Sequence, residues 1–157
     1  MEKLTQEQIN KILEGHKHWL NEDCKGWETM KADFSSCDLR DAEEVPYIPM
    51  ICPEEGDFIG WKRAGGKIVK LRIPEDALRS SATTRKCRCN KAEVIEIYNT
   101  DGTIADERIV SSNYDSSFTY KVGKTVEVQD FDTNRWEECA KGIHFFINRQ
   151  EAIDYQR

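Results

Sequence analysis

The residues best suited to bind a charged ligand gather in one cationic segment, residues 62–91. This segment holds ten basic and two acidic residues, a net charge of +8, whereas the rest of the chain holds 13 basic and 27 acidic residues, a net charge of −14. The basic residues are Lys62, Arg63, Lys67, Lys70, Arg72, Arg79, Arg85, Lys86, Arg88 and Lys91. Such a segment concentrates positive potential locally, while the acidic remainder repels long polyanions. The pattern favours a small anionic ligand over general nucleic-acid binding.

The side chains in and around this segment suit a ligand that carries both phosphates and planar bases. Arginine binds phosphate oxygens in pairs, and lysine supplies a point charge. Aromatic faces stack bases for about 1–3 kcal/mol each. We therefore predict a ligand-binding set that comprises Trp61, Lys62, Arg63, Lys70, Arg72, Thr83, Thr84, Arg85, Lys86, Arg88 and His144.

Alternation along residues 85–89 predicts how part of this set is presented. In an extended strand, Lys86 and Arg88 share one face, and the cysteines at 87 and 89 share the other face with Arg85. A sheet can thus bury the two thiols and show Lys86 and Arg88 to a ligand. The hydroxyl-rich loop 80–84 suits phosphate contacts or a mobile rim. The alternatives are a strand edge defended by charge and a basic hairpin that pairs with acidic neighbours.

The cysteines do not predict a metal site. The grouping with zinc-ligand chemistry comprises Cys87 and Cys89, with Cys52, Cys139 and His144. The two-residue knuckle spacing typical of zinc sites is missing, and one-residue spacing on a strand is that of an apolar pair. The N-terminal histidines form no metal motif either. No metal and no cofactor are expected.

Catalytic motifs are also missing from the sequence. Cys139 and His144 lie close together, but no third group that would orient them can be named. His144 fits a buried, hydrogen-bonded histidine or a hydrogen-bond donor in a pocket. No Walker loop, Gly-x-Ser-x-Gly or His-Glu-x-x-His occurs. We expect no catalytic residue, and a protein that is not an enzyme.

Length and composition predict one domain over residues 1–157. The chain is 38% hydrophobic and 33% charged, which is ordinary for a globular protein. Residues 1–45 are expected to form a helix and a short repeat, and residues 46–157 a mainly β region. No apolar run approaches the roughly 18 residues of a membrane span. Without a secretory signal, a cytoplasmic protein with six reduced cysteines is expected, in the host cytoplasm if it is phage-encoded.

The first 45 residues predict a capped helix and then a repeat. Thr5 as N-cap and Gln8 three residues later form a capping pattern, with Leu4 placed to pack on Ile9. An apolar face recurs at helical spacing, and Gly26 marks the end of this segment. That face comprises Ile9, Ile12, Leu13, His16, Trp19 and Leu20, with His16 packed inside. Residues 32–36 and 37–41 then follow the pentapeptide-repeat pattern, in which Ala32, Phe34, Cys37 and Leu39 point inward.

The remainder predicts an antiparallel sheet. Residues 58–63 and 67–73 flank Gly65-Gly66, a strong hairpin signal. Further strands are expected within 85–98, 120–128 and 143–147, with a turn or short helix start at residues 74–77. Asn148 and Glu151 form the capping pattern of a short final helix. The predicted fold class is α+β: a twisted, mostly antiparallel sheet with an N-terminal helix, a pentapeptide-repeat remnant and a short C-terminal helix.

Several segments together resemble the C-terminal domain of many pentapeptide-repeat proteins. They are residues 60–62, 67–74, Ala77, 85–88, 92–94, 122–125, Cys139, 142–147 and 151–152. Residues 16–20 followed by 32–34 resemble the start of the same proteins, so the match covers nearly the whole chain. The chain departs from them in its repeat array, which is shortened to about half a coil. That domain, common in bacteria and phages, has no known function, so the resemblance implies kinship of fold.

A weaker resemblance is to phage proteins that sequester the cyclic nucleotides of the bacterial CBASS immune system. It rests on the small, phage-like architecture and the lack of enzyme motifs. It implies immune evasion by a sponge that binds a cyclic di- or oligonucleotide without turnover, as a homo-oligomer such as a tetramer. The alternative is a protein-interaction module whose acidic surface contacts a host protein. An enzyme that degrades such nucleotides is a third option. Neither long nucleic acid nor membrane is expected as a partner.

Overall fold

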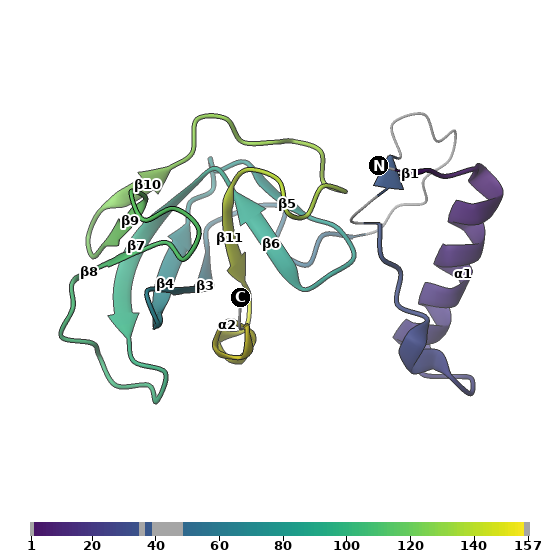
Figure 1. Ribbon diagram of the computed structural model, residues 1–157, viewed down its shortest axis with the longest axis horizontal. Coiled ribbons are helices and arrows are strands. Elements are labelled where there is room, and N and C mark those ends of the chain that lie inside the picture. Colours follow the sequence, from purple (N-terminus) through teal and green to yellow (C-terminus); the bar gives the residue numbers. More distant parts are fainter. Residues whose placement is uncertain (1, 35–36, 39–48, 156–157) are drawn as a thin grey trace.

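The computed structural model describes residues 2–34, 37–38 and 49–155 and confirms the α+β class (Figure 1). Its elements, in chain order, are β1 (Glu2–Lys3), α1 (Gln6–Asn21), the 3-10 helix η1 (Trp27–Thr29), β2 (Cys37–Asp38), β3 (Phe58–Ala64), β4 (Lys67–Ile73), β5 (Arg79–Ser81), β6 (Lys86–Cys89), β7 (Lys91–Tyr98), β8 (Ile109–Ser111), β9 (Thr119–Lys121), β10 (Thr125–Glu127), β11 (Ile143–Phe146) and α2 (Arg149–Asp154). Among the described residues, no helix has the length and apolar character needed to cross a bilayer.

Helix α1 begins as the sequence predicts and ends earlier. The Thr5 hydroxyl accepts from the backbone N–H of Gln8, whose side chain accepts from the Thr5 N–H. The last helical residue is Asn21. It is followed by Glu22 in the left-handed conformation, and Glu22 lies four residues before Gly26. The end placed at Gly26 was therefore wrong, because Glu22 itself takes the C-cap conformation that glycine usually supplies.

The buried face of α1 packs on the start of the predicted repeat. Ile9, Leu13 and His16 are buried, and the His16 ring accepts a hydrogen bond from the Ala32 N–H at 3.3 Å. Leu20 was wrongly placed on this face, since it is 63% exposed. Figure 1 shows α1 at one end of the molecule, beside the sheet.

The first predicted pentapeptide unit lies only partly within the described residues. Ala32 and Phe34 are buried and pack on α1. The Phe34 ring meets the Trp136 ring edge-on, with the ring centres 5.5 Å apart. Residues 35–36 and 39–41 lie outside the described residues. Trp136 is the contact that joins the N-terminal cluster to the long segment before β11.

A seven-stranded sheet in the order β10-β7-β4-β3-β11-β6-β5 forms the centre of the molecule. Each neighbouring pair runs antiparallel. The predicted β3–β4 hairpin is confirmed, and both turn glycines have positive φ, 55° at Gly65 and 74° at Gly66. A two-residue turn of this kind matches the twist of the two strands, and glycine adopts positive φ without a steric cost.

Some predicted strands are divided. Residues 120–128 form two strands, β9 and β10, because the chain turns at Gly123, where φ is 76°. Residues 85–98 likewise divide into β6 and β7 at Asn90. Strand β5 was not predicted, and its pairing with β6 buries Ser80 and Ser81. The expected mobile rim at 80–84 is therefore wrong in its N-terminal part.

Two apolar clusters lie on the sheet. The larger includes Val69, Leu71 and Ile73 of β4, which alternate on one face, with Cys87 and Cys89 of β6. The smaller forms around Ile68, Phe146 and Ala152, where α2 covers the sheet. Asn148 caps α2 and Glu151 completes the predicted capping box. Alternation thus placed the two thiols in the core, as the sequence predicts.

A substitution at Gly60 on β3 tests how tightly the larger cluster is packed. A Cβ at Gly60 would lie 2.6 Å from Cδ2 of the Phe145 ring. We expect Gly60→Ala to lower the free energy of unfolding by about 1–3 kcal/mol, because the ring must shift. The measurement is denaturation by urea.

Gly15→Ala in α1 is the control, because its Cβ meets atoms no closer than 3.6 Å. Helix propensity should raise its free energy of unfolding by roughly 0.5–1 kcal/mol. Equal effects of the two variants would contradict the packing argument.

Candidate functional site

A pocket of about 680 Å³ lies between the sheet, the β8–β9 hairpin and the segment that precedes β11. Its floor is made by Lys62 of β3, Lys86 of β6 and His144 of β11. The volume lies within the roughly 300–1,000 Å³ of small-molecule sites. Of the predicted set, Lys62, Arg63, Lys86 and His144 line this pocket, although they are spread over 83 residues of the printed sequence.

Strand register brings two of the three floor residues together. His144 lies opposite Arg88, and Phe146 lies opposite both Lys86 and Trp61. Side chains opposite one another on antiparallel strands share a face at close range. The Lys62 ammonium donates to the backbone carbonyl of His144 at 3.1 Å. Register thus places Lys86 and His144 on one face with Trp61, whereas Lys62, the next residue of β3, starts from the other face, and its ammonium reaches the His144 carbonyl.

The Lys62 ammonium lies 5.6 Å from the centre of the Tyr120 ring. Burial lowers the pKa of Lys62 from 10.5 to about 8, and the positive charge of Lys86 also lowers it. Burial likewise raises the pKa of the Tyr120 hydroxyl. In the described part of the chain, neither Lys62 nor Lys86 forms an ion pair with a carboxylate. An anion bound here would stabilise both charged ammonium groups.

His144 is neutral at neutral pH. Burial first, and then the charges of Lys62 and Lys86, lower its pKa from 6.5 to about 4. Its Nε2 lies 3.1 Å from the backbone carbonyl of Glu138. Because a carbonyl only accepts, Nε2 carries the hydrogen in this contact and Nδ1 is left as an acceptor.

Lys86 and Cys139 form the polar edge of the floor. The Lys86 ammonium lies 3.2 Å from the Cys139 sulfur, and Cys139 is exposed. Cys139 and His144 thus both line the pocket, and the structure adds a lysine beside the thiol.

Aromatic side chains form much of the wall. Phe118 and Tyr120 meet edge-on from the β8–β9 hairpin, with ring centres 5.4 Å apart, and Phe146 packs on Tyr155. Tyr114, at the tip of the same hairpin, is 71% exposed. Acidic side chains also line the pocket, at Asp115, Glu127 and Asp130, the last paired with Lys141. The pocket offers cations, aromatic faces and acceptors together.

Arg88 does not face a ligand, and its expected exposure was wrong. Its side chain is buried, with the residue 2% exposed. The guanidinium donates to the backbone carbonyls of Asp132 at 2.9 Å, Lys141 at 3.0 Å and Asn134 at 2.8 Å. It also lies over the Phe131 ring. The segment 131–142 covers the face on which alternation placed Arg88, and Arg88 holds that segment in place.

Thr83 and Thr84 also serve the framework. Their backbone N–H groups donate to one carboxylate oxygen of buried Glu138, at 3.0 and 2.9 Å. This contact ties the 83–84 loop to the pocket wall. Neither threonine lines the pocket.

The other predicted site residues lie outside the pocket. Trp61 packs on Tyr98, with Lys70 over its ring. Arg72 pairs with Glu93 at 2.6 Å, and Arg85 pairs with Glu151 at 2.5 Å. Lys67 and Lys91 pair with Glu107 and Asp76. Four of the ten basic residues therefore pair with acidic neighbours, as the alternative interpretation of the segment expected.

Sequence reasoning missed the aromatic wall and Lys141. The loop of the β8–β9 hairpin lies within residues 111–118, where two aromatic residues stand among serines, an asparagine and an aspartate. That composition is a usable signal for a polar, aromatic binding loop. Nothing in the sequence indicated that this loop would meet the cationic segment.

The cysteines and His144 do not gather into one zinc site. Cys52, Cys87 and Cys89 are buried in the core, whereas Cys139 is exposed at the pocket. Within the described ranges, one group of His, Cys, Asp or Glu ligand atoms lies close enough to hold an ion, and it stands elsewhere, at the end of α1.

Comparison with known proteins places this fold in a family. The model of a family of unknown function, DUF5758, matches residues 48–152. The chain belongs to this family. Every pocket-lining residue except Tyr155 lies inside the matched region. The pocket is thus built by the DUF5758 region itself.

A viral protein is similar over part of this region. Uncharacterized protein L223 of Acanthamoeba polyphaga mimivirus is 38% identical over 96 residues, which are 56% of this chain and 61% of the relative. The chain therefore spans less than two thirds of that relative. No solved structure matches the chain.

Replacing Arg88 tests its structural role. We expect Arg88→Ala to lower the free energy of unfolding by about 3 kcal/mol, because three carbonyls lose their donor and a void remains. Arg72→Ala, which breaks an exposed ion pair, should cost less than about 1 kcal/mol. Thermal and urea denaturation measure both. Similar losses for the two variants would contradict the assignment.

The lowered pKa of His144 predicts a loss of stability in acid. The unfolded chain takes up a proton near pH 6.5, whereas folded His144 takes it up only near pH 4. The stabilising effect of neutral His144 is therefore complete above pH 6.5 and is lost as the pH falls toward 4. At pH 5 the free energy of unfolding should already be lower by about 2 kcal/mol. His144→Gln should flatten this part of the curve of unfolding free energy against pH. An unchanged curve would contradict the prediction.

Proposed function

We propose that the pocket binds a small anionic ligand that carries planar rings, and that this ligand is a cyclic di- or oligonucleotide held without turnover. The observation that carries the proposal is the pair of lysines, Lys62 and Lys86, on the floor of an aromatic pocket without carboxylate partners among the described residues. A phosphate between them would accept charge-assisted hydrogen bonds, which are worth about 1.5–3 kcal/mol each.

The walls support a nucleotide over a simple anion. Tyr114, which is exposed, and Phe118, which is half-buried, offer ring surface at the pocket, and base stacking on such rings contributes about 1–3 kcal/mol per base. Asp115 and Glu127 can accept from ribose hydroxyls or from the amino groups of bases. A plain inorganic anion would use only the floor.

Binding rather than turnover is supported by the state of His144. With a pKa of about 4, it is neutral at pH 7, and its Nε2 hydrogen is engaged by the Glu138 carbonyl. A general acid is most effective when its pKa lies near the working pH. The ring therefore suits hydrogen bonding to a ligand.

The wider biological setting remains part of the proposal. A viral relative supports a viral protein acting in the host cytoplasm, where sequestration of a signalling nucleotide would blunt immunity. We propose further that the chain acts as a homo-oligomer, and that residues 32–41 are a pentapeptide-repeat remnant. Mass measurement in solution tests the oligomer.

A calorimetric screen against cyclic di- and trinucleotides, with inorganic phosphate and mononucleotides as comparisons, tests the proposal. We expect Lys62→Gln and Lys86→Gln to weaken binding about 10- to 100-fold, from the loss of one charge-assisted bond each. Lys70→Gln is the matched control, because its ammonium lies over Trp61 outside the pocket, and its affinity should equal that of the wild type.

The pH dependence and the fate of the ligand complete the test. Affinity should fall as the pH rises through about 8, because Lys62 loses its charge there, and Lys62→Gln should remove this dependence. Chromatography of the denatured complex should return the nucleotide intact, whereas hydrolysed product would indicate an enzyme. Failure of every cyclic nucleotide to bind would overturn the proposal and favour the protein-interaction alternative, which pull-downs from infected cells would then address.

A further inference from the structure

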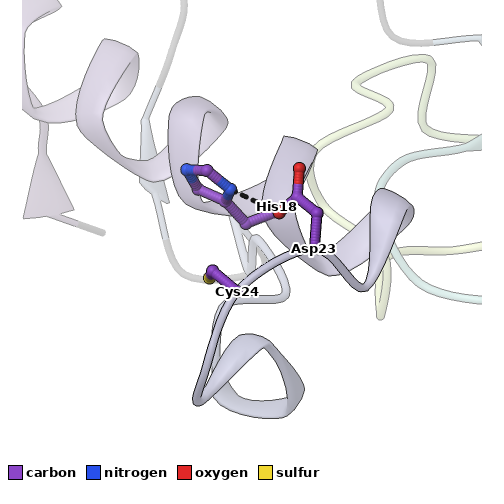
Figure 2. Close-up of side chains that lie close together, drawn as sticks. All are labelled: His18, Asp23 and Cys24. Carbon is purple, nitrogen blue, oxygen red and sulfur yellow. Dashed lines mark hydrogen bonds and ion pairs between the residues drawn. The ribbon is translucent and has the colours of Figure 1, made fainter.

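Three side chains with metal-binding chemistry converge at the C-terminal end of α1. They are His18 in the last turn of the helix, and Asp23 and Cys24 just after it. One ligand atom from each, a ring nitrogen, a carboxylate oxygen and a sulfur, all lie within 4.8 Å of one another. Figure 2 shows the His18 ring bonded to Asp23, with the Cys24 sulfur near them. The group lies far along the chain from the proposed nucleotide pocket.

The backbone explains how these residues meet. Glu22 has φ 52° and ψ 34°, and it is the one non-glycine residue with positive φ in the described part of the chain. This left-handed residue ends the helix and turns the chain, so that Asp23 and Cys24 come back beside His18. An L-residue with a side chain adopts this conformation at a cost, so the turn depends on contacts that follow it.

The donor set selects the class of ion. Imidazole, thiolate and carboxylate are the ligands of zinc, at about 2.0–2.3 Å, whereas calcium and magnesium prefer oxygen alone. The Met30 sulfur lies 3.8 Å from the Cys24 sulfur and adds a soft neighbour. We propose that His18 Nδ1, Asp23 and Cys24 bind a zinc ion, with water in the fourth position.

Geometry and access agree with this assignment. His18 Nδ1 and Asp23 Oδ1 are 2.6 Å apart as a hydrogen-bonded pair, and a shared tetrahedral ion requires them to separate to roughly 3.3 Å. Rotation of exposed side chains accomplishes this, because the side chains of His18 and Asp23 are 40% and 47% exposed. An ion can therefore enter from solvent, and binding would fasten the end of α1 to the turn after it.

Titration of untagged, reduced protein with Zn²⁺ by calorimetry, and with Co²⁺ as a spectroscopic probe, tests the site. We expect one ion per chain, release of protons from the ligands, and a thiolate-to-cobalt charge-transfer band in the near ultraviolet. Cys24→Ser should abolish the band, and His18→Gln or Asp23→Asn should weaken Zn²⁺ binding at least about tenfold each. Cys139→Ser, which removes an exposed thiol at the other site, should leave both readouts unchanged.

Stability provides a second, independent readout. A chelator should lower the melting temperature of zinc-loaded wild type and leave Cys24→Ser unaffected, because an ion stabilises only the state that binds it. Circular dichroism checks that the metal-free variants are folded. Unchanged Zn²⁺ affinity in folded Cys24→Ser, or a cobalt band that is lost in Cys139→Ser instead, would overturn the assignment.

Discussion

The buried guanidinium of Arg88 is the interaction on which the pocket depends. It points from β6 into the segment 131–142 and donates to three carbonyls of that segment. This segment contains no helix or strand whose hydrogen bonds would occupy its backbone carbonyls. The Arg88 guanidinium, which has five N–H donors, supplies hydrogen bonds to three of them instead. Glu138 reinforces it from the opposite direction by accepting from Thr83 and Thr84. A charged pair of anchors thus gives an irregular wall a defined shape.

The pocket floor shows the opposite use of charge. Lys62 and Lys86 lie beside neutral His144, and their ammonium groups contact a carbonyl, a thiol and an aromatic face. Burial, together with the charge of Lys86, lowers the pKa of Lys62. The anion proposed above would supply the negative charge that neither lysine finds in the described part of the chain. The same physics makes the floor sensitive to pH.

Positive charge within residues 62–91 therefore has three different uses. Arg72 and Arg85 pair with glutamates at the surface, where such pairs contribute little to stability. Arg88 and Arg79 donate to backbone carbonyls inside the fold. Lys62 and Lys86 face the pocket. The net charge of the segment overstated how many of its side chains line one pocket.

Local patterns in the sequence determined the elements. Both capping boxes, the Gly65-Gly66 hairpin and the burial of Cys87 and Cys89 follow from interactions between residues a few positions apart, and each was predicted. The pocket was not predictable in this way. Arg88 and Lys86 lie on the same face of β6. The segment 131–142 covers Arg88 and leaves Lys86 at the pocket floor. The left-handed Glu22, which brings Cys24 back to His18, likewise follows no sequence rule. Contacts between distant segments decide these positions, because their energies depend on which strands become neighbours.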